Sequence, residues 1–356
     1  MISSIHKETS GLLLQQQDQL AEELVQREFK LHPELEARYG AIGREKSLRD
    51  ARYHLGYLSE AVGRESPPLF EDYIAWARDM LTARNVLVED FAFHLDVLQG
   101  VLCDHLPLPN ADVANRYIAQ GARQLSKPTG PDTSFVDAEK PLGVLATSYL
   151  RSLLASDRRT ATKLIMEEVA SGTCVRDIYT YVFQPSQYEI GRLWQTNQIS
   201  VAQEHLCTAA TQMVMSQLYP QIFATEPVHG ALVATCVSGD LHEIGLRMVA
   251  DFLQMEGWDT HYLGANVPHR DVLKTLSDTG ATVLAISATM TFHVREVEAL
   301  ISQLRASPLG DKVRVLVGGY PFRIDPNLWK SVGADAFGRD AQETIELTKQ
   351  LRGQLR

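Results

Sequence analysis

Apolar and polar residues alternate with a period of three to four residues over most of residues 11–122, which predicts amphipathic helices. Gly-containing and Pro-containing breaks separate these helical patterns. A stretch rich in Pro, Gly and Ser then follows, which is typical of a linker. We therefore predict an all-α N-terminal domain over residues 1–125 and a linker over residues 126–137.

The pattern changes twice in the rest of the chain. Residues 138–222 contain four helix-length patterns joined by short turns, which predicts a four-helix bundle over residues 138–225. From residue 230 onward, short apolar runs suited to buried strands alternate with helix patterns. This alternation predicts a parallel, doubly wound α/β domain of the Rossmann-like, flavodoxin-like kind over residues 226–356.

Composition narrows the class of protein. The 356 residues are 45% hydrophobic and 22% charged, as in an ordinary globular protein, and the net charge of -10 argues against a general nucleic-acid surface. No apolar run is long enough for a membrane span, and the N-terminus lacks a secretory signal pattern. No two of the four cysteines have C-x-x-C spacing, which favours reduced thiols in a cytoplasmic protein.

The loop after the first predicted strand, Ser238–Gly245, holds the clearest candidate chemistry. In a doubly wound sheet, ligands bind beyond the carboxyl ends of the strands. A histidine placed there can bind a metal through one ring nitrogen while the other donates to a carboxylate, and Asp240 and His242 have suitable spacing. Gly245 would let a bulky group approach the helix backbone. A lone histidine in a loop is also typical of a solvated side chain.

Two further strand ends carry small or hydroxyl-bearing residues. Ser287 and Thr289 follow the third predicted strand, and Gly318 and Gly319 follow the fourth. Because parallel strands end at one edge of a sheet, these residues predict a long, narrow slot beside His242.

The segments GDLHEIG, ISATMT and VGG together resemble the signature of cobalamin-binding domains, over roughly residues 138–353. The resemblance implies that His242 is the lower axial ligand of cobalt and that Asp240 holds its imidazole. It also implies that the displaced nucleotide tail enters the slot. The implied cofactor-binding residues in this domain are Asp240, Leu241, Gly245, Ser287, Thr289, Gly318 and Gly319.

The four-helix bundle would then be a cap over the other face of the corrin. Its W-x9-E-H arrangement resembles the cap of light-sensing, adenosylcobalamin-dependent photoreceptors. The resemblance implies that Trp194 and Val201 line the adenosyl pocket, that Glu204 hydrogen-bonds the adenosyl group, and that His205 becomes the upper cobalt ligand after light. Taken singly, Trp194 is equally typical of a core residue, and Glu204 and His205 of a solvated helix face.

The acidic, aromatic N-terminal domain admits two interpretations. One is a helical dimerisation or spacer domain with an aromatic core. The other is a bilin pocket, because the domain order resembles that of the photocobilins, which use adenosylcobalamin and biliverdin. That resemblance implies cations for the bilin propionates and polar groups for its pyrroles. The candidate bilin-binding residues are Arg52, Arg78 and Arg84 among the cations, and His54, Tyr57 and His94 among the polar groups.

These resemblances favour a photoreceptor that binds adenosylcobalamin and biliverdin and is not an enzyme. Light would break the cobalt–carbon bond and change a homo-oligomer, a dimer or tetramer, or its contacts with a separate output protein. We expect no nucleic-acid or membrane partner. The alternative is a corrinoid methyl-carrier component of a methyltransferase, which predicts methyl or cob(I)alamin chemistry and no effect of light on assembly. A third interpretation, a cobalamin store or chaperone, does not need His205.

Overall fold

The computed structural model describes residues 3–128, 133–224 and 226–353, which form two compact units. The helical unit combines Met1–Thr129 with two later segments, Ala288–Ala299 and Tyr320–Gly333. The sheet unit contains the remainder, Gly130–Ser287, Leu300–Gly319 and Ala334–Arg356. Parts of the predicted linker and of the predicted domain ends, at residues 1–2, 129–132, 225 and 354–356, lie outside the described residues.

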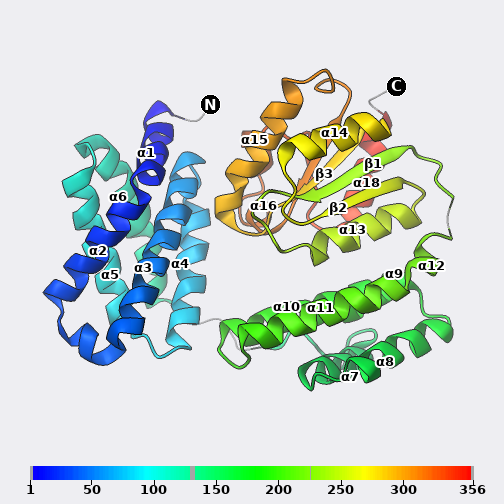
Figure 1. Ribbon diagram of the computed structural model, residues 1–356, viewed down its shortest axis with the longest axis horizontal. Helices are drawn as coiled ribbons and strands as arrows, with labels where there is room; N and C mark the ends of the chain where they lie inside the picture. The colour runs from blue at the N-terminus through cyan, green and yellow to red at the C-terminus, as the bar shows by residue number, and fades with distance from the viewer. Residues whose placement is uncertain (1–2, 129–132, 225, 354–356) are drawn as a thin grey trace. The chain divides into compact units, whose positions relative to one another are not determined.

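The helical unit is built from helices packed side by side (Figure 1), and each of the long helices buries apolar side chains. Pro67 and Pro68 open one helix, and Pro109 lies in the first turn of another, where a missing backbone N–H costs nothing. Gly40 has a φ of 64° and bends the longest helix, a conformation that favours glycine. The helices are α1 (Ser4–Gln15), α2 (Gln17–Leu31), α3 (Glu34–Gly63), α4 (Pro67–Thr82), α5 (Val88–His105), α6 (Leu108–Ala122) and η1 (Arg123–Ser126).

The two later segments of the helical unit are short and follow strands of the sheet. They contain η3 (Thr291–His293), the first half of α15 (Val294–Arg305), α16 (Tyr320–Ile324) and α17 (Leu328–Ser331). The sequence pattern predicts α15 and the region of α17 but not the five-residue α16.

In the sheet unit, each of the four helical stretches expected over residues 138–222 contains a helix. Polar caps fix two of the starts. The Asp157 side chain accepts from the Thr160 N–H at 3.0 Å, and Ser200 accepts from the Gln203 N–H at 3.2 Å. The elements are α7 (Gly143–Leu154), α8 (Arg158–Ala170), α9 (Val175–Ile178), the π-helical turn η2 (Tyr179–Phe183), α10 (Gln184–Gln195), α11 (Val201–Gln217) and α12 (Tyr219–Ile222).

Residues 226–353, all of which the structure describes, contain a five-stranded parallel sheet in the order β2-β1-β3-β4-β5. The parallel Rossmann-like domain predicted from the sequence is therefore confirmed. Helices α13 and α18 contact each other on one face, and α14 and α15 cover the other (Figure 1). The elements are β1 (Ala231–Cys236), α13 (Ile244–Met255), β2 (Asp259–Gly264), α14 (His269–Thr279), β3 (Val283–Ser287), β4 (Arg314–Gly318), β5 (Ala336–Phe337) and α18 (Ala341–Gly353).

The bundle packs on the outer face of α13, and polar bonds reinforce this contact. The Tyr179 hydroxyl donates to Asp251 at 2.8 Å, and the Arg247 guanidinium donates to Ser216 at 2.9 Å and to Tyr219 at 3.1 Å. Apolar side chains of the bundle and of α13 belong to the same core cluster as Trp258, which is fully buried. The bundle is thereby held beside the loop that precedes α13.

Candidate functional site

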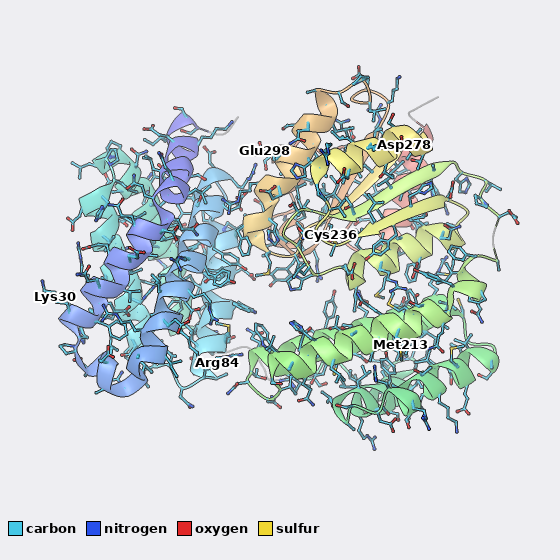
Figure 2. The ribbon with its side chains drawn as sticks, viewed as in Figure 1. Lys30, Arg84, Met213, Cys236, Asp278 and Glu298 are labelled. Atoms are coloured by element: carbon cyan, nitrogen blue, oxygen red, sulfur yellow. The ribbon has the colours of Figure 1, made fainter. Side chains whose placement is uncertain are left out.

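The carboxyl ends of the three central strands lie in one row. Cys236, the last residue of β1, is in register with Ser287 of β3, which is in register with Gly318 of β4. Figure 2 labels Cys236 at this end of β1. The expected edge is therefore present, and the loop Ser238–Gly245 starts from it.

Backbone turns hold this loop in place. Gly239 has a φ of 83°, a conformation that favours glycine, and its N–H donates to the Asn266 side chain at 2.8 Å. The Asn266 N–H donates back to the Asp240 carbonyl at 3.1 Å. The loop after β2 thus supports the loop after β1, so that Asp240 has a fixed backbone position.

Asp240 and His242 are paired, as their spacing predicts. The Asp240 Oδ1 atom lies 2.9 Å from His242 Nδ1 and also accepts the His242 backbone N–H at 3.0 Å. The Asp240 side chain is fully buried, whereas 59% of the His242 side chain is exposed. A buried carboxylate therefore fixes Nδ1 as the donor and leaves the Nε2 lone pair directed outward.

Neighbouring groups raise the pKa of His242. The hydrogen bond to Asp240 raises the pKa of His242, against the opposing effect of burial. The negative charges of Asp240 and Glu204 raise this pKa further. Glu204 lies on α11, so the bundle contributes to the electrostatics of the loop.

Space for a large group exists at the start of α13. A Cβ atom added at Gly245 would have no heavy atom within 4 Å, and 73% of Leu241 is exposed. At the end of β4, Gly319 has a φ of 105°, which disfavours any side chain there. Ser287 is half-buried at its strand end. Thr289 lies two residues further on, within the helical unit, and is described with that unit.

The predicted cap residues lie at the end of α10 and in the first turns of α11. Trp194 is half-buried, whereas Val201 is 53% exposed. Glu204 Oε2 lies 2.5 Å from His205 Nδ1, and Glu204 Oε1 accepts from Thr208 at 3.0 Å. His205 itself is 74% exposed. A half-buried Glu204 is therefore paired with an exposed His205 on the surface of α11.

Sequence reasoning missed the role of Glu243, the residue after His242. The Gln212 amide of α11 donates to Glu243 Oε1 at 2.7 Å, and the Tyr262 hydroxyl of β2 donates to Glu243 Oε2 at 2.9 Å. This carboxylate therefore ties the bundle, the histidine loop and the sheet together. Its position beside a candidate ligand was the only signal in the sequence.

The residues suggested for a bilin already bind one another or other protein groups. Tyr57 stacks on Tyr73 with ring centroids 3.6 Å apart, and His54 Nδ1 lies 2.7 Å from the Tyr73 hydroxyl. Further partners hold the remaining residues. Arg52 binds Asp18, Arg78 binds the carbonyls of Gln124 and Lys127, Arg84 donates to the Met80 carbonyl, and His94 pairs with Glu28. These side chains thus form an aromatic core and helix-end contacts.

Within residues 3–128, 133–224 and 226–353, no helix combines the length and apolar character that a membrane crossing requires. In the same ranges, no three His, Cys, Asp or Glu side chains gather to hold a metal ion. His242 is thus a single candidate ligand with a carboxylate behind it.

Comparison with known proteins assigns the family. B12 binding domain models match residues 145–219 and 230–347. A dimethylamine corrinoid protein 3 of Methanosarcina mazei is 31% identical over 153 residues, which cover 41% of this chain and 89% of that protein. This chain belongs to the corrinoid protein family. The dimethylamine corrinoid protein of Methanosarcina barkeri is 34% identical over 123 residues, and these span 34% of this chain and only 56% of that relative.

A solved structure agrees with the fold of this corrinoid protein. The Methanosarcina barkeri monomethylamine corrinoid protein superposes with a TM-score of 0.53 and 22% identity, over 59% of this chain and all of that chain. At that identity the likeness shows the fold alone.

The family assignment overturns our photoreceptor interpretation. The relatives are named methylamine corrinoid proteins, so the resemblance to photocobilins, the light-sensing function and the light-dependent homo-oligomer with an output partner are wrong. Biliverdin is likewise unsupported, because the suggested bilin ligands contact one another and other protein groups. The adenosyl form is unsupported because the comparisons give only B12 binding domains and corrinoid proteins. B12 binding itself is retained.

Proposed function

We propose that this protein is the corrinoid component of a methyltransferase system, in which His242 holds the cobalt of a bound cobalamin. The observation that carries the proposal is the Asp240–His242 pair at the carboxyl end of β1. The names of the dimethylamine and monomethylamine relatives support methylated amines as the source of the methyl group.

The residues present fit a corrinoid. Its ring supplies four nitrogen ligands to cobalt, so one protein imidazole is enough for the lower position. His242 offers an outward Nε2 with a buried carboxylate on Nδ1, the arrangement that raises the basicity of a metal-binding histidine. The open space at Gly245 and the positive φ of Gly319 fit a large group that runs close to the backbone.

We propose specific roles for the surrounding residues. Asp240 orients the imidazole, and Ser287, Gly318 and Gly319 line the path of the nucleotide tail from the strand ends. Leu241 and Gly245 border the same path. On the bundle side, Trp194, Val201 and Glu204 face the reacting side of the ring. Thr289 stays a candidate for the path through its proximity in sequence to Ser287.

When bound, the corrinoid supplies a cobalt that accepts and releases a methyl group. The protein's own contribution is to bind and orient this group and to exclude water from it. Trp194 offers apolar surface for that exclusion, and the Gln212–Glu243 bond holds α11 against the loop.

The proposal is tested by cycling a methyl group on the full chain. The protein is loaded with hydroxocobalamin, desalted, reduced with titanium(III) citrate, treated with ¹³C-methyl iodide and then given a thiolate acceptor. We expect one ¹³C-methyl thioether per bound corrinoid in each of several cycles, with the corrinoid still on the protein. Loss of the corrinoid during the first cycle, or failure to accept the methyl group, would contradict the proposal.

A light control separates this function from the interpretation corrected above. Protein loaded with adenosylcobalamin in darkness is passed through a sizing column before and after green light. We expect identical elution volumes. A light-dependent change in assembly would refute the methyl-carrier assignment, even if cobalamin binding were secure.

A further inference from the structure

The two segments that leave the carboxyl ends of β3 and β4 are packed with the N-terminal helices. Ala288–Ala299 begins directly after Ser287, and Tyr320–Gly333 begins directly after Gly319. Both segments therefore start at residues that we assign to the path of the nucleotide tail. The chain that follows Ser287 and the chain that follows Gly319 therefore both belong to the helical unit.

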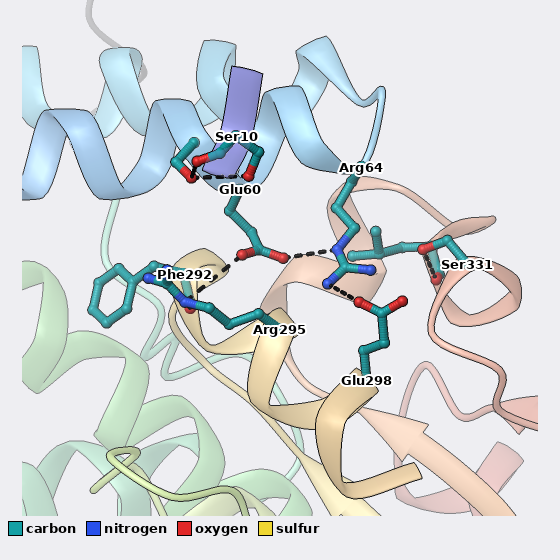
Figure 3. A network of polar contacts seen from close by, with 9 residues as sticks. Ser10, Glu60, Arg64, Phe292, Arg295, Glu298 and Ser331 are labelled. Carbon is teal, nitrogen blue, oxygen red and sulfur yellow. Dashed lines mark hydrogen bonds and ion pairs between the residues drawn. The ribbon is translucent and has the colours of Figure 1, made fainter. Parts of the chain in front are cut away.

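A buried ion-pair network makes the first of these contacts (Figure 3). Arg64, the residue directly after α3, donates to Glu60 Oε1 at 2.7 Å and pairs with Glu298 of α15 at 2.8 Å. Arg295 of α15 lies 3.9 Å from the second oxygen of Glu60. The side chains of Arg64 and Glu60 are only 5% and 4% exposed. The network thus joins α3 to the first turns of α15.

Aromatic and polar contacts reinforce both segments. Tyr57 of α3 meets the Phe292 ring edge-on at 5.3 Å, and its hydroxyl lies 3.9 Å from the Met290 sulfur. After β4, the Ser66 hydroxyl donates to Asp325 at 2.7 Å. The Tyr320 hydroxyl donates to Asp72 at 3.0 Å.

The chemistry of the network favours a positioning role over simple stabilisation. Burying two charges costs desolvation that their attraction only just offsets, so apolar side chains would hold α3 and α15 together equally well. An ionic network differs in that its contacts between α3 and α15 are made in one register only, because a shift of one helix turn would separate Arg64 from Glu298 and Arg295 from Glu60. It therefore specifies where α15, and the loop between Ser287 and α15, must lie.

We propose that Glu60 and Arg64 are positioning residues for the corrinoid site, acting through α15 on the loop that follows Ser287. This inference rests on the proposed function. The helical unit then sets the conformation of the two loops that bound the tail path, so that corrinoid binding and the packing of α3 on α15 are coupled. Coupling of this kind is reciprocal, so each event must stabilise the other.

The first test follows hydrogen exchange in the full-length protein with and without hydroxocobalamin. We expect the bound cobalamin to slow exchange about tenfold in peptides covering residues 57–66, at the end of α3 and just beyond it, and residues 288–299, as linkage requires. Peptides covering α2 and α5 serve as internal controls and are expected to change little. Equal exchange of residues 57–66 in the two states would overturn the coupling.

The second test breaks the network and measures the dissociation rate of hydroxocobalamin by exchange against excess labelled cobalamin. Glu298→Gln removes one partner of Arg64 at a position 41% exposed, so the variant is expected to fold. We expect about tenfold faster dissociation in it. Arg64→Met is expected to have a larger effect, because it leaves the buried Glu60 without its 2.7 Å partner.

A matched control lies in the same unit. Arg27 pairs with Glu23 one helix turn away at 2.8 Å and with Asp104 of another helix at 2.7 Å, the same bridging geometry away from the two loops. Arg27→Met is expected to leave the dissociation rate unchanged. Equal dissociation rates in wild type, Glu298→Gln and Arg27→Met would refute the inference, as would equal acceleration in both variants.

The two proposals fail in distinguishable ways. If the wild-type protein takes up no cobalamin, the proposed function itself fails. If wild type binds cobalamin through His242 but α3 shows neither protection nor an effect of Glu298→Gln, only the positioning role of Glu60 and Arg64 is lost.

Discussion

Asp251 on α13 provides a stability prediction whose size follows from the structure. Its side chain is 6% exposed, accepts the Tyr179 hydroxyl at 2.8 Å and lies near Arg247. Burial raises the pKa of Asp251 from 3.8 to about 6, more than the Tyr179 bond and the Arg247 charge lower it. The carboxyl group is thus charged at neutral pH in a place that disfavours the charge.

The direction of the pH effect follows from the bound protons. Between pH 4 and pH 6 the folded protein keeps the Asp251 proton and the unfolded chain releases it. The stability contribution of the group is therefore complete below about pH 4 and is lost as the pH rises through about 6. A shift of this size corresponds to about 3 kcal/mol of unfolding free energy, at about 1.4 kcal/mol per pKa unit.

Asp251→Asn removes this charge and keeps an oxygen that accepts the Tyr179 hydroxyl. We expect the variant to match wild type near pH 4 and to be up to about 3 kcal/mol more stable at pH 7.5. Urea unfolding of both proteins from pH 4 to 8, followed by circular dichroism, measures the difference. Asp278→Asn, at a side chain 58% exposed, is the control and should differ little from wild type. A difference that does not vary with pH, or a variant less stable at pH 7.5, would refute the reasoning.

Four further predictions address the site and its surroundings. Asp240→Asn should weaken cobalamin affinity about 10-fold to 100-fold, because the imidazole loses its orienting carboxylate; equilibrium titration measures it, and an unchanged affinity would contradict the assigned role. Gly319→Ala should destabilise the fold by about 1–3 kcal/mol through its φ of 105°, as thermal unfolding would show; a gain in stability would count against this strain. Gln212→Leu should lower the free energy of unfolding by about 1–2 kcal/mol, because it leaves Glu243 without its hydrogen-bond donor from α11. The control Gln217→Leu, at an exposed position, should change the free energy of unfolding little in the same urea assay. A thiol reagent should modify Cys103 and Cys174 quickly and Cys207 slowly, because Cys207 is buried and burial raises its pKa to about 11; rapid labelling of Cys207, identified by mass spectrometry of its peptide, would show that the bundle core opens readily.

Local patterning predicted the elements well because local burial decides them. Over the described residues 226–353, the apolar runs that predict strands coincide with β1 to β5, and the helix patterns coincide with α13, α14, α15 and α18. The pairing of Asp240 with His242 was also predicted, from a spacing that lets a carboxylate reach the imidazole two residues on. The row formed by Cys236, Ser287 and Gly318 follows from parallel register.

Contacts between residues far apart in the chain could not be predicted from the sequence pattern. Nothing in the local pattern of residues 288–299 indicates that Glu298 will meet Arg64, more than 200 positions earlier, so the composition of the helical unit could not be foreseen. The partners of Glu243 come from α11 and β2, on either side of it in the chain.

Short motifs misled the functional interpretation for a related reason. Trp194, Glu204 and His205 have a spacing that resembles an adenosyl-binding cap, yet their residue types are equally suited to a half-buried wall and a polar pair on a helix surface. The aromatic residues of the N-terminal helices likewise suit a core as well as a pocket, and Tyr57 packs on Tyr73. Residue type and spacing alone do not distinguish these cases.

The central claim is that His242 binds cobalt, and electron paramagnetic resonance of bound cob(II)alamin tests it most directly. The protein is produced with ¹⁵N-histidine and loaded with unlabelled cobalamin. Nitrogen-14 in the lower position splits each cobalt line into three, whereas nitrogen-15 splits it into two. We predict doublets in the labelled wild-type protein, triplets in the unlabelled protein, and no histidine splitting in His242→Ala. Triplets that persist in the labelled protein would show that the nucleotide base still occupies the lower position, and would contradict the account.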